Sequence, residues 1–178
     1  MALKATIFKA ALQVNDLDRH YYQQHALTLA RHPSETDERL MVRVLAFALH
    51  AGPDLEFGKG ISSEEPTLWQ RDATGLIELI IELGLPDEQL LRRACGRARE
   101  VVVYTYGGRT VTHWWEKASP SLAKQHNLRV FEVAPQTTAA LAALADRNMT
   151  LQCLIADGEA QILSGDHLVP VELTRRNP

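Results

Sequence analysis

The sequence has few cysteines, few aromatic residues and no long apolar run. Its 178 residues include 2 cysteines, Cys95 and Cys153, and 6% are aromatic. Two isolated cysteines form neither the framework of a disulfide-rich secreted domain nor the spacing of a zinc site. No apolar run reaches the roughly 18 residues of a transmembrane helix, and the opening MALKATIFKA lacks the pattern of a secretory signal. We therefore expect a cytoplasmic protein that does not bind a membrane.

An excess of positive charge is also missing. The formal net charge is -3 at pH 7, with 23% charged and 46% hydrophobic residues. A chain with this balance has no overall basic field that attracts nucleic acid or an anionic membrane, but it can carry a local basic patch. Length and composition are those of an ordinary globular protein, and we expect one domain over residues 1–178.

Sequence patterns near both ends of the chain predict antiparallel hairpins. Segments 3–14 and 20–30 alternate weakly and flank the turn-rich stretch NDLDR. Near the other end, MTLQCLIADGEAQIL contains the pair Asp157-Gly158, and Asp-Gly between two strand-like segments is typical of a two-residue hairpin turn. LVPVELT is expected to be a further strand. We expect these terminal segments to add antiparallel strands to a sheet formed by the middle of the chain.

The middle of the chain alternates helix and strand signals. Segment 35–50 places Val42, Leu45 and Leu49 on one helical stripe, with Ser34 as the expected N-cap. Strand–helix–strand order favours parallel pairing with right-handed crossovers, so the fold class is α+β, a mixed sheet flanked by helices. The further strands are expected in LEFGKGI, TLWQR, LIELIIEL, VVVYTYG and LRVFEV, and the further helices after Pro86, in RTVTHWWEKASPSLAKQHN with a break near Pro120, and in QTTAALAALADRN.

The segment IELIIELG carries two carboxylates on a strand that otherwise suits a core. Because alternate side chains of a strand point to opposite faces, Glu78, Glu82 and Gly84 share one face. Glu78 lies about 13 Å from Glu82, too far to share one ion, and we place it at the solvated end of the strand. A carboxylate without a partner among isoleucines is costly. Glu82 is therefore expected either to bind a metal ion or to form an ion pair with Arg93 on the next helix.

The chain resembles the YaeQ family of small bacterial proteins over nearly its whole length. The residues that carry the resemblance are the opening MALKATIFKA, the helix entry LTLARHPSETDER, the segment EEPTLWQR, the strand-to-helix join IELGLPDEQ and ADRNMTLQ near the end. The order of elements also resembles the core of the PD-(D/E)XK nuclease superfamily. This resemblance implies a restriction-endonuclease-like fold, but it implies no particular substrate.

The superfamily resemblance implies Mg²⁺-dependent phosphodiester hydrolysis. Mg²⁺ takes hard oxygen ligands, commonly one or two carboxylates, and keeps water and substrate phosphate in its other positions. On this chain Glu82 matches the acid of the third strand, and Glu38 matches the glutamate of the first helix. Thr67 stands where the superfamily has an acid after Pro66, so Glu65 is expected to serve as a metal ligand instead.

The lysine of the superfamily pattern is also missing from its usual position. Gly84 stands where the pattern has a lysine, and we expect Arg93 on the next helix to take its place. Arginine holds a phosphate but stays protonated, so it cannot act as a base. The carboxylates of Glu38 and Glu82 are expected to be close enough to share an ion, with Glu82 largely buried beside a cleft. The expected catalytic residues are Glu38, Glu82 and Arg93, and the expected Mg²⁺ ligands are Glu65 and Glu82.

Some of these positions also have a structural interpretation. Glu38 at a helix start is favoured by the positive end of the helix dipole. Arg93 belongs to an arginine run that either tracks a phosphate backbone or forms a solvated helix face paired with the nearby acids Asp87, Glu88 and Glu100. Two functions therefore stay open, a metal-dependent nuclease or related phosphodiesterase and a non-catalytic module that binds nucleic acid or a protein partner. The retained acids favour the first function, and the two departures from the pattern favour the second.

Overall fold

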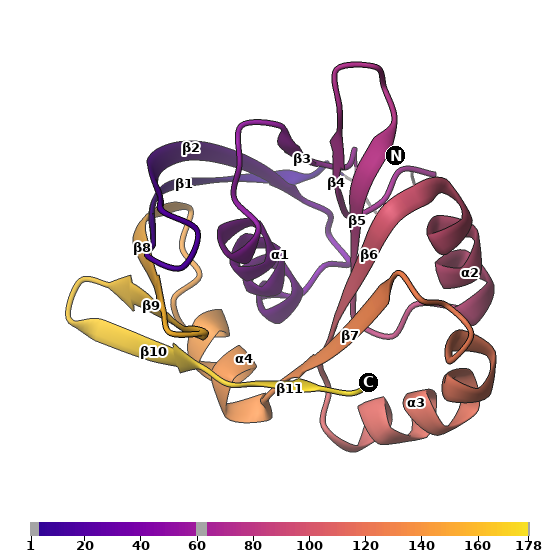
Figure 1. The fold of residues 1–178 in the computed structure, drawn as a ribbon. Helices are drawn as coiled ribbons and strands as arrows, with labels where there is room; N and C mark the ends of the chain where they lie inside the picture. The colour runs from indigo at the N-terminus through magenta and orange to yellow at the C-terminus, as the bar shows by residue number, and fades with distance from the viewer. Residues whose placement is uncertain (1–3, 60–63, 178) are drawn as a thin grey trace. The chain divides into compact units, whose positions relative to one another are not determined.

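The structure, a computed structural model, describes residues 4–59 and 64–177 (Figure 1). The positions of the chain's parts relative to one another are not determined, so the single domain expected over residues 1–178 stays a prediction. None of the described helices is long and apolar enough to span a membrane. The chain divides into two compact units, of which unit 1 comprises Met1–Gly52 and Gln136–Glu172 and unit 2 comprises Pro53–Pro135 and Leu173–Pro178.

Unit 1 contains a five-stranded mixed sheet. Its strands are β1 (Thr6–Asp16), β2 (Tyr21–Arg31), β8 (Asn148–Ala156), β9 (Glu159–Ser164) and β10 (His167–Val171). They lie in the order β10-β9-β8-β1-β2, in which β1 pairs antiparallel with β2 and parallel with β8. Alternate residues of β1 and β8 are buried, so that Leu12 pairs with Leu151 and Val14 with Cys153 on one apolar face.

Both predicted hairpins are confirmed, but their place in the fold is not the predicted one. Asp157 (φ 54°) and Gly158 (φ 76°) form the turn between β8 and β9, with both residues in the left-handed region that such turns require. The Asp18 carboxylate of the β1–β2 turn accepts hydrogen bonds from the backbone N–H groups of these two residues, each at 2.8 Å. The two hairpins therefore pair with each other in a separate sheet instead of extending the sheet of the middle segment.

Helix α1 (Asp37–Leu49) of unit 1 is buried on every side in its central part. Every residue from Leu40 to Ala48 is buried, whereas the sequence predicted a single apolar stripe. Arg43 is the charged residue among them, and its Nη2 lies 2.7 Å from Glu35 Oε1. A helix that is enclosed in this way is a core element, and its one charged side chain is tolerated because it is paired.

Two helix details differ from the predictions. The N-cap of α1 is Thr36 instead of Ser34, because the Thr36 hydroxyl accepts the Arg39 backbone N–H at 3.1 Å. Helix α3 (Arg109–Leu122) runs through Pro120 without a break. Since this proline stands in the last turn, it removes a single backbone bond close to the helix end. Helix α4 (Pro135–Ala142) follows at the start of the second segment of unit 1.

Unit 2 contains a six-stranded mixed sheet in the order β11-β7-β6-β5-β4-β3. Strand β5 is interior, and β6 and β7 follow it in parallel, as the sequence predicted. Residues 60–61 of the predicted strand LEFGKGI lie outside the described residues. The elements of unit 2 are β3 (Leu55–Phe57), β4 (Leu68–Arg71), β5 (Ile77–Leu83), α2 (Glu88–Arg97), β6 (Ala98–Thr105), α3, β7 (Leu128–Val133) and β11 (Leu173–Arg175).

Helices α2 and α3 cover one face of the unit 2 sheet (Figure 1). Leu91 and Ala94 of α2 and Leu122 of α3 pack on side chains of β5, β6 and β7. Trp114 and Trp115 are both partly buried against this core, and the Trp114 ring N–H donates to the Pro86 carbonyl at 2.8 Å. The α2–α3 layer thereby fixes which side of α2 faces solvent.

Candidate functional site

Glu82 lies near the carboxyl end of β5, on the face that α2 and α3 cover. Its Cα pairs with that of Val103 in β6, and Val103 belongs to the buried core of this face. Ile80, two residues earlier on the same face, is fully buried. Glu82 itself is partly buried, and its predicted place beside a cleft stays a prediction. It therefore stands where the apolar face of the strand ends.

The Glu82 carboxylate accepts a hydrogen bond from Thr67. The Thr67 hydroxyl donates to Glu82 Oε2 at 2.9 Å. This neighbourhood follows from the antiparallel pairing of β4 with β5, in which Leu68 lies opposite Ile81. The position after Pro66 thus lies beside the acid of β5, where the superfamily pattern places a second carboxylate. A hydroxyl at this position steadies the charge of Glu82, whereas a second carboxylate would repel it.

Gly84, directly after β5, has a backbone conformation that glycine adopts far more readily than most other residues. Its φ is 81°, and its N–H donates to the Tyr104 carbonyl at 3.0 Å. Any other L-residue in this left-handed region costs roughly 1–2 kcal/mol. A lysine two residues after Glu82 would therefore be strained in this chain. The turn that leads from β5 into α2 therefore gives a backbone reason for glycine at this position.

Arg93 is exposed on the outer side of α2. Leu91, Ala94 and Cys95 are the buried residues of this helix, so Arg93 faces away from the core. Within residues 4–59 and 64–177, Arg93 forms no ion pair with Glu82 or with another carboxylate. The structural ion pair that the sequence left open for Glu82 is therefore not formed.

Glu78, the other carboxylate of β5, is held at the strand end. Its Oε2 lies 3.2 Å from Arg99 Nη1, an exposed ion pair with the start of β6. The sequence predicted a solvated residue, and the structure adds this partner. Glu78 is therefore separate from Glu82 both in position and in its contacts.

Glu65 has a local structural partner. Its Oε2 accepts the Lys59 backbone N–H at 3.0 Å, and its Oε1 lies 3.8 Å from Lys59 Nζ. Close by, the Gly58 backbone is pressed against Pro66, because a Cβ built on Gly58 would lie 1.8 Å from the Pro66 carbonyl oxygen. These contacts join residues 58–59, which follow β3, to residues 65–66, which precede β4. The predicted role of Glu65 as a metal ligand stays a prediction.

Glu38 lies in the first turn of α1 and is partly exposed. It forms no hydrogen bond or ion pair with another described residue. Because Glu38 belongs to unit 1 and Glu82 to unit 2, their predicted sharing of an ion stays a prediction. In the part of the chain that the structure describes, no group of three or more His, Cys, Asp or Glu side chains is arranged to hold a metal ion. The Mg²⁺ site is thus also still a prediction.

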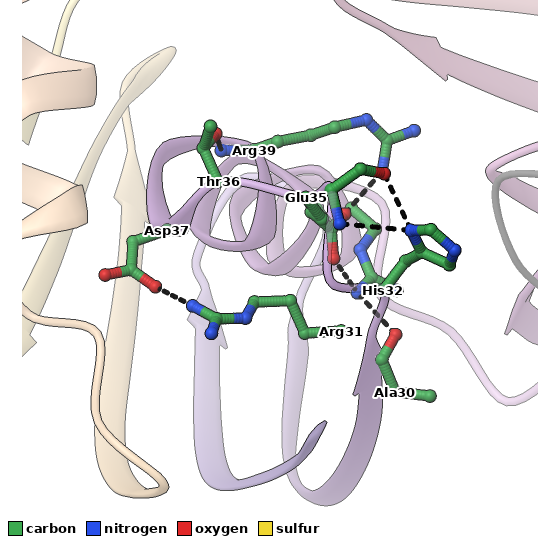
Figure 2. A network of polar contacts seen from close by, with 9 residues as sticks. Ala30, Arg31, His32, Glu35, Thr36, Asp37 and Arg39 are labelled. Atoms are coloured by element: carbon green, nitrogen blue, oxygen red, sulfur yellow. Dashed lines mark hydrogen bonds and ion pairs between the residues drawn. The ribbon is translucent and has the colours of Figure 1, made fainter. Parts of the chain in front are cut away.

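A buried ionic network at the start of α1 was missed by the sequence analysis (Figure 2). The Glu35 side chain is 1% exposed. Its Oε2 accepts from Arg39 Nη1 at 2.5 Å and its Oε1 from Arg43 Nη2 at 2.7 Å, while Arg43 also donates to the Ala30 carbonyl at 3.2 Å. The spacing of Glu35, Arg39 and Arg43, four residues apart at the predicted helix start, is the signal that would have indicated it.

The family signature ARHPSETDER supplies most of this network. Arg31 at the end of β2 forms an ion pair with Asp37, the first residue of α1 (Figure 2). Between them, His32 Nδ1 accepts the Ser34 backbone N–H at 3.1 Å and lies 2.6 Å from the Ser34 hydroxyl. These contacts hold the connection between β2 and α1 in one conformation. The signature therefore has a structural role at this connection.

Both cysteines are free and buried. Burial raises the pKa of the Cys95 thiol to about 11. Burial, with a further contribution from the Asp16 carboxylate, raises the pKa of Cys153 to about 12 against the opposing effect of Arg19. Because the thiolate is the nucleophile and the metal ligand, protonated thiols at neutral pH do neither.

Comparison with known proteins gives the family of the chain. The model of the YaeQ protein family matches residues 1–173. YaeQ proteins of Salmonella typhi and Escherichia coli K12, both described as uncharacterised, are 44% and 43% identical over 175 residues, which cover 98% of this chain and 97% of each relative.

Two crystal structures of YaeQ proteins each superpose on this chain with a TM-score of 0.92. The protein from Xanthomonas axonopodis pv. citri is 51% identical over 97% of this chain and 98% of its own. The protein from Pseudomonas syringae is 31% identical over 98% of this chain and 97% of its own. The chain belongs to the YaeQ family.

Proposed function

We propose that the protein is a metal-dependent phosphodiesterase of PD-(D/E)XK type that acts on nucleic acid, with Glu82 as its central carboxylate. The observation that carries the proposal is the position of Glu82 at the carboxyl end of an interior strand. Ligands of open sheets bind outside the carboxyl ends of parallel strands. Glu82 is partly exposed and is oriented by the Thr67 hydroxyl at this end of the strand, which supports a functional role.

The arrangement of unit 2 supports a restriction-endonuclease-like core. Strands β4 and β5 are antiparallel, β5, β6 and β7 are parallel, and α2 connects β5 to β6. This is the strand and helix order from which the superfamily resemblance was inferred. The Thr67–Glu82 contact supports the same alignment, because it brings the position after Pro66 beside the acid of β5.

The side chains around Glu82 have the donor chemistry that suits Mg²⁺. Glu82 supplies a charged oxygen and Thr67 a neutral one, and Mg²⁺ prefers hard oxygen ligands and keeps several waters. When bound, the ion would polarise the phosphate and lower the pKa of a bound water. Glu82 would hold it, with Glu65 as the other proposed carboxylate. Thr67 would orient the Glu82 carboxylate by donating its hydroxyl hydrogen.

A cleavage assay with matched variants tests the proposal. Purified protein is incubated with DNA and RNA substrates in Mg²⁺ or EDTA, and the products are resolved by length. Glu82→Gln should abolish Mg²⁺-dependent cleavage, because the neutral amide cannot replace a charged metal ligand. The matched control is Glu78→Gln on the same strand, which should cleave like the wild type because Glu78 pairs only with the exposed Arg99 in the contacts given above. Cleavage that persists in Glu82→Gln would refute the role of Glu82.

Two observations favour a second candidate function, a non-catalytic module that binds nucleic acid. Gly84 has a φ of 81°, so a lysine is disfavoured at the position that the superfamily uses for catalysis. Thr67 replaces the second acid beside Glu82. For this function we expect the wild type and Glu82→Gln to bind nucleic acid equally well, with no cleavage by either protein in Mg²⁺.

A further inference from the structure

We infer that the outer face of α2 holds a phosphate-binding site for a nucleic-acid backbone, formed by Gln89, Arg92 and Arg93. An open hollow of about 380 Å³ is lined by these three side chains. The choice of nucleic acid as ligand rests on the proposed function, whereas the site itself rests on the geometry and charge of this helix.

The three side chains are directed into the same hollow by helix periodicity. Gln89 is followed by Arg92 and Arg93 at the three- and four-residue spacings that place side chains on one helix face. The opposite side of α2 is held against the core by Leu91 and Ala94. The arginine face therefore cannot turn away from solvent without the loss of that packing.

The two arginines differ from most other arginines of unit 2 in their partners. Arg92 and Arg93 are exposed and form no ion pair within the described residues. In contrast, each of four other arginines of this unit meets a carboxylate, in the pairs Arg71–Glu56, Arg99–Glu78, Arg129–Glu100 and Arg176–Glu132. Two adjacent guanidinium groups without a protein anion form a local basic patch on a chain whose net charge is -3.

The acids that lie near these arginines in the sequence form no ion pairs with them within the described residues. Asp87 caps α2 and accepts the Gln89 backbone N–H at 2.8 Å. Glu100 pairs with Arg129, and Glu88 forms no ion pair among the described residues. Arg92 and Arg93 therefore form a solvated helix face, as one interpretation of the sequence had it, but within the described residues they form no ion pair with these acids. A guanidinium group binds carboxylate or phosphate oxygens in a bidentate geometry, and the proposed function selects phosphate as the ligand.

The surface next to the hollow favours an extended polyanion over a single small anion. Gly96 lies one turn beyond the two arginines, and a Cβ built on it would meet no atom within 4 Å. This bare stretch of helix is followed by Arg97, which lies about 6 Å from Arg93 along the helix axis. Arg97 also forms no ion pair among the described residues. A backbone with successive phosphates can follow this line of cations, as nucleic-acid backbones do on basic surfaces.

A binding experiment without metal tests this site. Fluorescence anisotropy is measured in EDTA with labelled duplex and single-stranded DNA and RNA, over about 50–200 mM salt. The double variant Arg92→Gln with Arg93→Gln should bind at least about 10-fold more weakly, and its slope of log affinity against log salt should fall by about 2. The control double variant, Arg71→Gln with Arg99→Gln, removes the same charge from ion-paired positions and should bind close to the wild type.

The outcomes separate this site from the proposed catalysis. An equal loss in the two double variants, or a wild type that binds none of the probes, would overturn the site. Loss of binding in the Arg92 and Arg93 variant alone supports the site, even if no protein cleaves in Mg²⁺ and the catalytic proposal fails. Unchanged affinity in that variant with Glu82-dependent cleavage intact would refute the site and leave the catalytic proposal standing. Melting temperatures close to the wild type should accompany both double variants, because the substituted side chains are exposed.

Discussion

Substitution of Glu35 by glutamine should destabilise the protein far more than removal of the Glu38 charge in the first turn of α1. The Glu35 carboxylate is 1% exposed and accepts charge-assisted hydrogen bonds from Arg39 and Arg43. Removal of one partner from a buried ionic network costs about 3–5 kcal/mol. The glutamine carbonyl still accepts one bond, so we expect a loss near the lower end, about 3 kcal/mol. For a chain of this size, this corresponds to a fall of about 6–12 °C in the melting temperature.

Urea unfolding followed by circular dichroism measures this loss, and Glu38→Gln provides the control. Glu38 lies in the first turn of α1 without a partner among the described residues, so its removal should cost less than about 1 kcal/mol. The Glu35→Gln loss should persist in high salt, because a buried pair is screened far less than a surface pair. The m-value should stay unchanged, since the surface exposed on unfolding is the same. A loss below about 1 kcal/mol, or one that salt abolishes, would show that Glu35 is not held as a buried charge.

Three further predictions concern backbone strain, the thiols and pH. Gly84→Lys should destabilise the protein by about 1–2 kcal/mol through its positive φ, whereas Gly96→Ala should stabilise it by about 0.5–1 kcal/mol in chemical unfolding; the same sign for both variants would contradict the backbone argument. Cys95 and Cys153 should resist Ellman's reagent at neutral pH in the native state and react after denaturation, and rapid native labelling would show that they are accessible. Burial lowers the pKa of His25, so the unfolded state takes up its proton first and stability falls as pH drops below about 6.5. His25→Gln should reduce the stability difference between about pH 7.5 and pH 5, and an unchanged difference would assign the pH dependence to other groups.

Most strands and helices of this chain were predictable from local signals. An Asp-Gly pair forces a hairpin at residues 157–158 because few other residues accept positive φ there. The alternation of β1 and the branched run of β5 give strands through side-chain periodicity. The order of β5, α2, β6, α3 and β7 then gives the parallel pairing, because the crossover helices leave little choice of topology.

The sequence also identified Glu82 as the exceptional side chain of β5, since a carboxylate among isoleucines is visible without coordinates. The hydrogen-bond partner of Glu82 could not be predicted from the sequence. Thr67 meets Glu82 because of the register between β4 and β5, and register depends on how two strands slide past each other. The positive φ of Gly84 likewise depends on the turn in which the chain leaves the sheet.

Only the tertiary structure decided where the terminal hairpins lie and how the charges on α1 are satisfied. β1 and β8 are separated by most of the chain, and their parallel pairing creates a second sheet that no local pattern indicates. The burial of α1 on every side and the enclosure of Glu35 between two arginines arise in the same way. Local sequence determines backbone preference and side-chain periodicity, whereas long-range pairing and desolvation depend on surfaces that meet only after the chain has folded.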